Sequence, residues 1–138
     1  MKISLCNLKK IPLSNSIDSV LVVSKKLRDE KQKHCLILEG GQPVGIISVT
    51  DINNRLVAED KDATVTKAKE IMTKDILIKN IDDSLSGAYI DMIKTNKYSC
   101  IILKGGKVEG ILDLKEAMNC IVKLKHDENK KGKSRKKK

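Results

Sequence analysis

The sequence predicts an α+β (mixed α/β) fold built from two copies of one strand–helix–strand–strand–helix unit. A shift of 65 residues aligns the two halves of the chain without gaps. Within this alignment, "CLILEGGQPVGII" at 35–47 falls on "CIILKGGKVEGIL" at 100–112, and "DSV" at 18–20 falls on "DSL" at 83–85. Each half also has apolar residues at helical spacing ahead of two apolar runs that flank a Gly-Gly pair.

Each copy opens with a short apolar stretch and continues into a helix. The opening stretches are "IPL" at 11–13 and "ILI" at 76–78. Helical spacing places three apolar residues on one face of each helix, Val20, Val23 and Leu27 in the first copy and Leu85, Ala88 and Met92 in the second. Ser16 and Asp82 are residue types that cap helices, and we expect them to begin these two.

The two apolar runs of each copy predict a hairpin or a closely spaced pair of strands. Gly40-Gly41 and Gly105-Gly106 lie at the turns, where positive backbone angles favour glycine. Runs such as "CLIL" have no polar alternation, so we expect those strands to be covered on both faces. A second helix follows in each copy, from about Thr50 and from about Leu114.

These patterns divide the chain into four segments. We predict a first repeat at 1–57, a linker at 58–71, a second repeat at 72–125 and a disordered basic tail at 126–138. Thr64 or Thr66 is expected to start a short connecting helix. A unit of about 60 residues buries little surface alone, so the two repeats are expected to pack into one body.

Charge leaves two interpretations of the tail open. The net charge is +10, and residues 126–138 hold seven basic and two acidic residues, so half of the excess lies there. A basic tail is typical of nonspecific binding to nucleic acid or to other acidic surfaces, but also of a segment that only aids solubility. Phe and Trp are absent and Tyr89 and Tyr98 are the only aromatic residues, which disfavours base stacking.

The residues with reactive side chains predict neither catalysis nor metal binding. The four cysteines have no CxxC spacing, and His34 and His126 are the only histidines, so we expect no metal site. The sequence offers no defensible catalytic spacing of Ser, His, Cys and Asp, so we expect no enzyme and no cofactor. No apolar run is long enough to cross a membrane, and no signal peptide is present, so a reducing cytoplasmic location is expected.

Two stretches resemble a known family. "GQPVGIISVTDI" at 41–52 is similar to the close of a first CBS repeat, and "EIMTKDILIKNIDDSL" at 70–85 to the opening of a second. Together with the duplication, they make about residues 7–124 resemble a CBS domain pair, or Bateman module. The resemblance implies repeats that pair through their sheets around a pseudo-twofold axis, with two clefts between them. It further implies binding of AMP, ADP, ATP or S-adenosylmethionine, homodimerisation, and regulation of a protein that the sequence does not name.

The resemblance implies a nucleotide site in the first repeat. The family pattern glycine–apolar–apolar–Ser/Thr–x–x–Asp falls on Gly45, Ser48 and Asp51, with Thr50 between the last two. A carboxylate can accept hydrogen bonds from a ribose diol, and a hydroxyl at a helix start suits a phosphate. The alternative is that these residues only cap a helix.

Four more residues complete the implied first site. The main chain of "IPL", which includes Ile11 and Pro12, matches the family segment beside adenine, and Lys33 and His34 match positions that often contact phosphate. The alternatives are a plain core strand for the first pair and ordinary solvated side chains for the second.

The second repeat departs from the family pattern. Asp113 stands where the first repeat has Ser48, and Glu116 stands where it has Asp51. An extra acid repels phosphate, although Lys115 partly offsets it. We therefore expect a second site that is degraded or selective for a ligand without phosphate. Its candidate residues are Thr73, Ile76, Tyr98, Asp113, Lys115 and Glu116.

Two functions follow as hypotheses. The first is a regulatory module that senses an adenosine nucleotide and signals to a partner through a conformational change. The alternative is a nucleic-acid or ribosome-associated protein anchored by its lysine-rich tail, with the repeats serving as a dimerisation scaffold.

Overall fold

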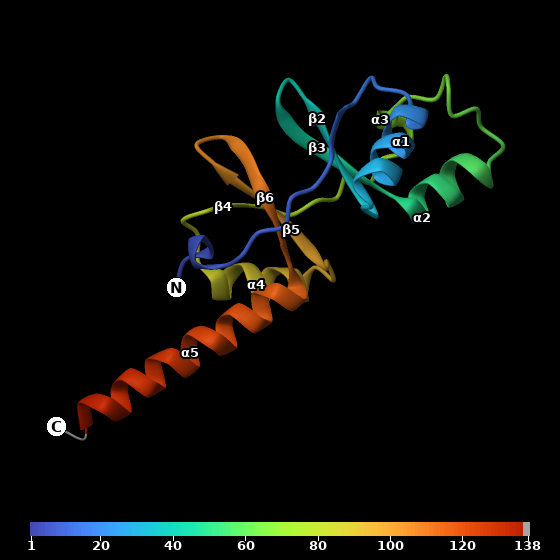
Figure 1. The fold of residues 1–138 in the computed structure, drawn as a ribbon. Coiled ribbons are helices and arrows are strands. Elements are labelled where there is room, and N and C mark those ends of the chain that lie inside the picture. Colours follow the sequence, from blue (N-terminus) through green and yellow to red (C-terminus); the bar gives the residue numbers. More distant parts are fainter. Residues whose placement is uncertain (137–138) are drawn as a thin grey trace. The chain divides into compact units, whose positions relative to one another are not determined.

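Each repeat forms its own three-stranded sheet (Figure 1). The first sheet has the order β1-β2-β3, with strands Leu13–Asn15, His34–Glu39 and Gln42–Ser48; the second has the order β4-β5-β6, with strands Ile78–Asn80, Ser99–Lys104 and Lys107–Asp113. β1 runs parallel to β2 with Leu13 opposite Leu36, and β4 runs parallel to β5 with Ile78 opposite Ile101. These pairs differ by 65 residues on both sides, so the repeat extends to strand register.

The helices complete the predicted order in both repeats. The protein is seen in a computed structural model that describes residues 1–136, with side chains through residue 129. Its helices are η1 (Ile3–Leu5), α1 (Val20–Glu30), α2 (Val49–Ile52), η2 (Asn53–Val57), α3 (Ala68–Ile71), α4 (Leu85–Lys94) and α5 (Leu114–Lys136). The predicted order strand–helix–strand–strand–helix is thereby confirmed. β1 and β4 begin two residues after the first residue of the apolar stretches, at Leu13 and Ile78.

The helix caps differ from those expected from the sequence. Ser19 caps α1 by accepting a hydrogen bond from the Val22 amide, and Ser84 caps α4 by accepting one from the Gly87 amide. The assignment of these roles to Ser16 and Asp82 was wrong. A turn follows each strand, so the cap lies three residues after Ser16 in the first repeat and two residues after Asp82 in the second.

The repeated Asp-Ser pair has a physical reason in this turn. Asp18 accepts hydrogen bonds from the Asn15 amide at 2.8 Å and from the Ser14 hydroxyl at 2.6 Å. Those bonds, the Ser14 bond above all, lower the pKa of the Asp18 carboxyl. Asp83 accepts from the Asn80 amide at 2.8 Å in the second repeat. The aspartate thus holds the strand-to-helix turn, and the serine that follows it caps the helix.

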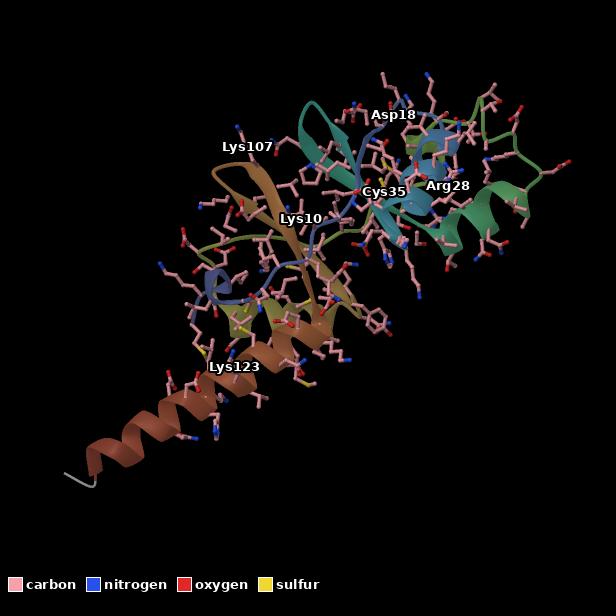
Figure 2. The ribbon with its side chains drawn as sticks, in the orientation of Figure 1. Lys10, Asp18, Arg28, Cys35, Lys107 and Lys123 are labelled. Atoms are coloured by element: carbon pink, nitrogen blue, oxygen red, sulfur yellow. The ribbon has the colours of Figure 1, made fainter. Side chains whose placement is uncertain are left out.

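The apolar helix faces predicted from the sequence are buried, and together with the central strands they build one core in each repeat. The first core contains Val20, Val23, Leu27, Cys35, Ile37, Ile47, Leu56, Ala68, Ile71 and Met72. The second contains Ile3, Leu85, Ala88, Met92, Cys100, Ile102, Leu112, Ala117 and Cys120. Cys35 lies on β2 beside α1, as Figure 2 shows. The hairpin glycines adopt positive φ angles, between 58° and 80°, as their turns require.

The segment ahead of each repeat packs with the other repeat. By internal contacts the chain divides into a first-repeat unit, Lys10–Ile76 with Gly105–Val108, and a second-repeat unit, Met1–Lys9 with Leu77–Lys104 and Glu109 onward. Ile3 is fully buried in the second core, and its amide donates to the Asp83 carbonyl at 3.0 Å. The boundaries predicted at 57, 71 and 125 divide the chain into continuous stretches of sequence. The two units are instead defined by contacts in space, and each combines separate stretches of the chain.

The connecting helix and the tail also differ in detail from the sequence expectations. The connecting helix is α3, which begins at Ala68 after Lys67, beyond both predicted threonines. α5 continues to Lys136, into the segment 126–138 for which composition predicts disorder. Lys, Glu and Arg are good helix formers, which favours propagation from a helix already started against the core. The side chains from 130 onward, and with them most of the predicted basic anchor, lie outside the described residues.

Candidate functional site

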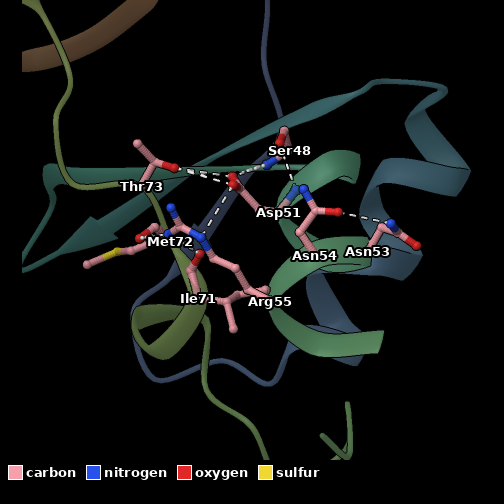
Figure 3. Close-up of polar contacts among 8 residues, drawn as sticks. All are labelled: Ser48, Asp51, Asn53, Asn54, Arg55, Ile71, Met72 and Thr73. Atoms are coloured by element: carbon pink, nitrogen blue, oxygen red, sulfur yellow. Dashed lines mark hydrogen bonds and ion pairs between the residues drawn. The ribbon is translucent and has the colours of Figure 1, made fainter. Parts of the chain in front are cut away.

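The junction between β3 and α2 is a closed capping box. Ser48, the last residue of β3, has an extended backbone and its hydroxyl accepts a hydrogen bond from the Asp51 amide at 3.0 Å. The Asp51 carboxylate accepts in return from the Ser48 amide at 2.9 Å (Figure 3). Both bonds are short enough to be well formed, and together they fix the position of the carboxylate. The capping role weighed for these residues is therefore present.

The same carboxylate has further partners beyond the box. The Thr73 hydroxyl donates to both Asp51 carboxylate oxygens, at 3.4 Å each, and Arg55 Nε lies 3.9 Å from one of them (Figure 3). The Asp51 side chain is 15% exposed. These outer contacts are longer than the capping bonds and therefore weaker. The Asp51 carboxylate thus has a short capping hydrogen bond and longer, weaker contacts with Thr73 and Arg55.

Arg55 connects this carboxylate to the C-terminal end of α3. Its guanidinium donates to the main-chain carbonyls of Ile71 at 3.1 Å and Met72 at 3.2 Å. Sequence reasoning missed this residue. Its position four residues after Asp51 on a helix is the signal that indicates such a pair.

Gly45 allows Thr73 to reach the site. Ile46 and Thr73 pair through their main chains, with bonds of 2.9 and 2.8 Å. A Cβ atom on Gly45 would lie 2.6 Å from the Met72 sulfur and 3.0 Å from the Thr73 carbonyl oxygen. The glycine of the family pattern is therefore required by the close approach of the segment that carries Thr73.

Other candidates of the first set lie near the box. His34 pairs with Ser48 across β2 and β3, and the Lys33 carbonyl accepts from the Val49 amide at 3.1 Å. The side chains of Lys33, His34 and Thr50 are exposed. Ile11 and Pro12 precede β1, and the Pro12 carbonyl accepts from the Leu36 amide at 2.8 Å.

The corresponding junction in the second repeat is held by a different pair of charges. Asp113 caps α5 by accepting a hydrogen bond from the Glu116 amide at 2.7 Å, and it forms an ion pair with Lys9. Lys9 pairs with Ile111 through its main chain, as Thr73 does with Ile46. Because Ile46 and Ile111 correspond in the repeat, Lys9 occupies in the second unit the place that Thr73 occupies in the first.

The Lys9 pair alters the ionisation of the second junction. Burial alone would raise the pKa of the Asp113 carboxyl, but the hydrogen bonds from Lys9 and from the Glu116 amide outweigh it and hold this pKa below its ordinary value. The hydrogen bond to Asp113 raises the pKa of the Lys9 ammonium in turn. The acid that replaces Ser48 is thus neutralised by a lysine that sequence reasoning did not include.

The remaining second-set candidates divide between the two units. Tyr98, Asp113 and Lys115 line a pocket of about 430 Å³ together with Tyr89, Leu114 and Met118. The Tyr98 carbonyl accepts from the Leu114 amide at 2.8 Å, which repeats the Lys33–Val49 bond. Thr73 and Ile76, in contrast, belong to the first-repeat unit, and Thr73 contacts the acid of the first set. Thr73 therefore lies beside the acid of the first set, although the sequence grouped it with the second.

Comparison with known proteins decides the family. The CBS domain family matches residues 9–58 and 68–123, which is most of the chain. The chain belongs to the CBS domain family. Among curated proteins, the CBS domain-containing protein CBSCBSPB2 of Arabidopsis thaliana is 30% identical over 79 residues, 57% of this chain. The chain spans about 15% of that relative's length.

Solved structures of CBS proteins share the fold. The CBS domain protein PAE2072 of Pyrobaculum aerophilum, complexed with AMP, matches with a TM-score of 0.69 at 18% identity, over 84% of this chain and 89% of that one. The CBS domain pair of protein MJ0100, in complex with 5'-methylthioadenosine and S-adenosylmethionine, matches with a TM-score of 0.66 at 23% identity, over 93% and 98%. At these identities the similarity establishes the CBS pair fold.

Metal ligation depends on side chains, which the structure describes through residue 129. No group of three or more His, Cys, Asp and Glu residues is placed to hold a metal ion within this part of the chain. Among the helices of the described part, none combines the length and apolar character that crossing a membrane requires.

Proposed function

We propose that this CBS pair is a regulatory module that binds an adenosine-containing nucleotide at the β3–α2 junction of its first repeat. The observation that carries the proposal is the double role of Asp51. Its carboxylate is fixed by two short capping bonds, while its other contacts, from Thr73 and Arg55, are long. A ribose diol that donates to this carboxylate would exchange weak contacts for charge-assisted hydrogen bonds.

The neighbouring groups suit the rest of such a ligand. Arg55, Lys33 and His34 bring basic side chains to the same junction, and the Ser48 hydroxyl, which accepts the capping bond, can still donate its own hydrogen. Cationic groups near a hydroxyl that can donate favour phosphate. In the second unit, the Lys9 pair already satisfies Asp113, so we propose that a phosphorylated nucleotide prefers the first junction.

Signalling follows from the position of Thr73. Its segment connects the two repeats in sequence, and it contacts Asp51 through bonds that a ligand would replace. A ligand that favours one arrangement of this segment shifts its population, which a partner protein can detect.

We also propose that the module is a homodimer, because Ile90 and Ile93 on α4 and Met118 and Val122 on α5 expose apolar side chains. Analytical ultracentrifugation measures that state.

A melting experiment tests the binding proposal. Helix content is followed by circular dichroism while AMP, ATP or S-adenosylmethionine is added, with GMP as the control for base identity. A ligand at 100 times its Kd adds about 2.7 kcal/mol of stability and raises the melting temperature by several degrees. We expect a shift with at least one adenosine compound and a smaller one with GMP. Equal shifts with GMP, or none with any compound, would contradict the proposal.

A further inference from the structure

Arg55 is anchored through one nitrogen of its guanidinium and keeps further donors. Its Nη1 donates to the main-chain carbonyls of Ile71 at 3.1 Å and Met72 at 3.2 Å, and its Nε lies 3.9 Å from the Asp51 carboxylate (Figure 3). A guanidinium has five N–H donors, of which Nη1 carries two and Nε and Nη2 carry the other three. The side chain is 50% exposed. Arg55 can therefore bind a ligand without giving up its two carbonyl bonds.

The two anchoring carbonyls are held by the first core. Ile71, the last residue of α3, is fully buried, and Met72 is 9% exposed beside it. Met72 also lies against Gly45, where a Cβ atom would come within 2.6 Å of its sulfur. Carbonyls at the C-terminal end of a helix lack donors within the helix, so the guanidinium satisfies groups that need a partner. Arg55 is thus ordered before a ligand binds, which lowers the entropic cost of binding.

We propose that Arg55 binds the phosphate of the nucleotide, sets the preference for AMP over adenosine, and links the phosphate to the end of α3. This inference rests on the proposed nucleotide site at the β3–α2 junction. When the ribose diol takes the Asp51 carboxylate, Nε loses its long contact and turns to the phosphate, while Nη1 keeps the carbonyls. Asp51 and Arg55 are one helical turn apart, about 5.4 Å along the axis, a span comparable to that between the diol and the 5'-phosphate of one sugar. Arginine also presents paired donors that match phosphate oxygens.

The other basic side chains of the junction are less well prepared for this role. Lys33 and His34 are exposed, and ordering an exposed lysine on a phosphate costs rotamer freedom that Arg55 has already lost. A lysine is also a point charge and lacks the paired donors of a guanidinium. Arg55 is therefore the residue of this junction that best distinguishes a phosphate.

The corresponding place in the second unit holds a cysteine. Cys120 corresponds to Arg55 in the repeat and is 8% exposed in the second core. The cation of that junction is Lys9, which comes from the N-terminal segment and is already paired with Asp113. We therefore expect the preference for a phosphorylated ligand to come from the first junction.

Phosphate binding at Arg55 also connects the ligand to the residues that follow α3. The guanidinium joins the phosphate to Ile71 and Met72, and the next residue, Thr73, pairs with Ile46 through main-chain bonds of 2.8 and 2.9 Å. A phosphate that holds Arg55 in place favours this paired arrangement. At saturation, the Thr73 and Ile46 amides should exchange their hydrogens more slowly in the AMP complex than in the adenosine complex. Equal exchange in the two complexes would contradict this link.

Calorimetry with two ligands tests the proposal. Adenosine and AMP differ only in the phosphate, and both are titrated into the wild type, Arg55→Met, Arg55→Lys and Lys33→Met. We expect the wild type to bind AMP about ten- to a hundredfold more tightly than adenosine, the range for a hydrogen-bonded charged contact. Arg55→Met should bind adenosine within about twofold of the wild type and lose most of its preference for AMP. Arg55→Lys should keep part of the preference, and Lys33→Met should keep most of it.

The results separate this inference from the proposed function. Affinities for AMP and adenosine within about twofold of each other in the wild type would overturn the inference alone, and this result needs no variant. An unchanged preference in Arg55→Met, even with both ligands weakened, would show that Arg55 only supports the fold of the junction. A larger loss in Lys33→Met would assign the phosphate to Lys33. If neither ligand binds, the inference fails, and the melting experiment with ATP and S-adenosylmethionine decides whether the proposed function fails with it.

Discussion

Thr73 in the first unit and Lys9 in the second occupy the same place beside a capping acid. The Thr73 hydroxyl lies 3.4 Å from both carboxylate oxygens of Asp51, and Lys9 forms an ion pair with Asp113. Each is carried by the segment that pairs with the strand before the junction, at Ile46 or Ile111. One repeat thus keeps a neutral hydroxyl at this place, and the other has a matched pair of charges.

The Lys9–Asp113 pair should contribute a small, pH-dependent stabilisation. Lys9 is 69% exposed and Asp113 24%, so solvent screens the pair, and a double-mutant cycle with Lys9→Met and Asp113→Asn should measure roughly 0.2–1 kcal/mol. Urea unfolding at pH 7 gives the four free energies. A coupling energy near zero would show that the pair is not formed in solution.

The sign of the pH dependence follows from the lowered pKa of Asp113. Its unfolded pKa is the ordinary 3.8, and its folded pKa is lower. The stabilisation is therefore fully present above pH 3.8 and is lost as the pH falls through the folded pKa. The difference in stability between the wild type and Asp113→Asn should shrink below pH 4. A difference that stays constant from pH 7 to pH 3 would contradict this.

Substituting Gly110 should destabilise the second unit. A Cβ atom there would lie 2.9 Å from the Lys9 carbonyl oxygen, a backbone atom that cannot turn aside. Gly110→Ala should lower the free energy of unfolding by roughly 1–3 kcal/mol through overpacking. The matched control is Gly87→Ala on α4, where the Cβ would meet only Ser84 at 3.4 Å and should add roughly 0.5–1 kcal/mol. Chemical denaturation compares them; equal effects would be inconsistent with the close approach.

The cap assignments are open to a similar comparison. Ser84→Ala removes the hydroxyl that accepts the Gly87 amide and should cost about 1 kcal/mol of stability. Asp82→Ala removes a residue whose side chain is 74% exposed and whose ion pair with Lys2 is long, at 3.7 Å, so its effect should be close to zero. A larger loss of stability in Asp82→Ala than in Ser84→Ala, measured by thermal unfolding, would show that Asp82 is the cap.

Local patterns predicted most of the fold because they act within one repeat. Helical spacing identified both buried helix faces, and the Gly-Gly pairs identified both hairpin turns. The crossing of Met1–Lys9 to the second repeat was not predictable in this way. No periodicity in a nine-residue segment indicates which of two similar sheets it joins, because that choice is made by tertiary contacts such as the burial of Ile3.

The candidate site was predictable only in part. The pattern at Gly45, Ser48 and Asp51 indicated a junction whose geometry then proved to be a capping box. Arg55 was missed although its spacing of four residues from Asp51 indicates such a pair, whereas Lys9 and Thr73 contact their acids from other segments of the chain. Correspondence within the repeat would have linked Lys9 to Thr73 only after the strand pairing was known.

Isothermal titration calorimetry on two corresponding variants tests the central proposal most directly. The adenosine nucleotide that shifts the melting temperature is titrated into the wild type, Asp51→Asn and Glu116→Gln. Losing one charge-assisted acceptor costs about 1.5–3 kcal/mol, so Asp51→Asn should weaken binding by roughly ten- to a hundredfold. Glu116→Gln should bind within about twofold of the wild type, a difference below 0.5 kcal/mol. Unchanged binding in Asp51→Asn, or a loss confined to Glu116→Gln, would contradict the assignment of the nucleotide to the first repeat.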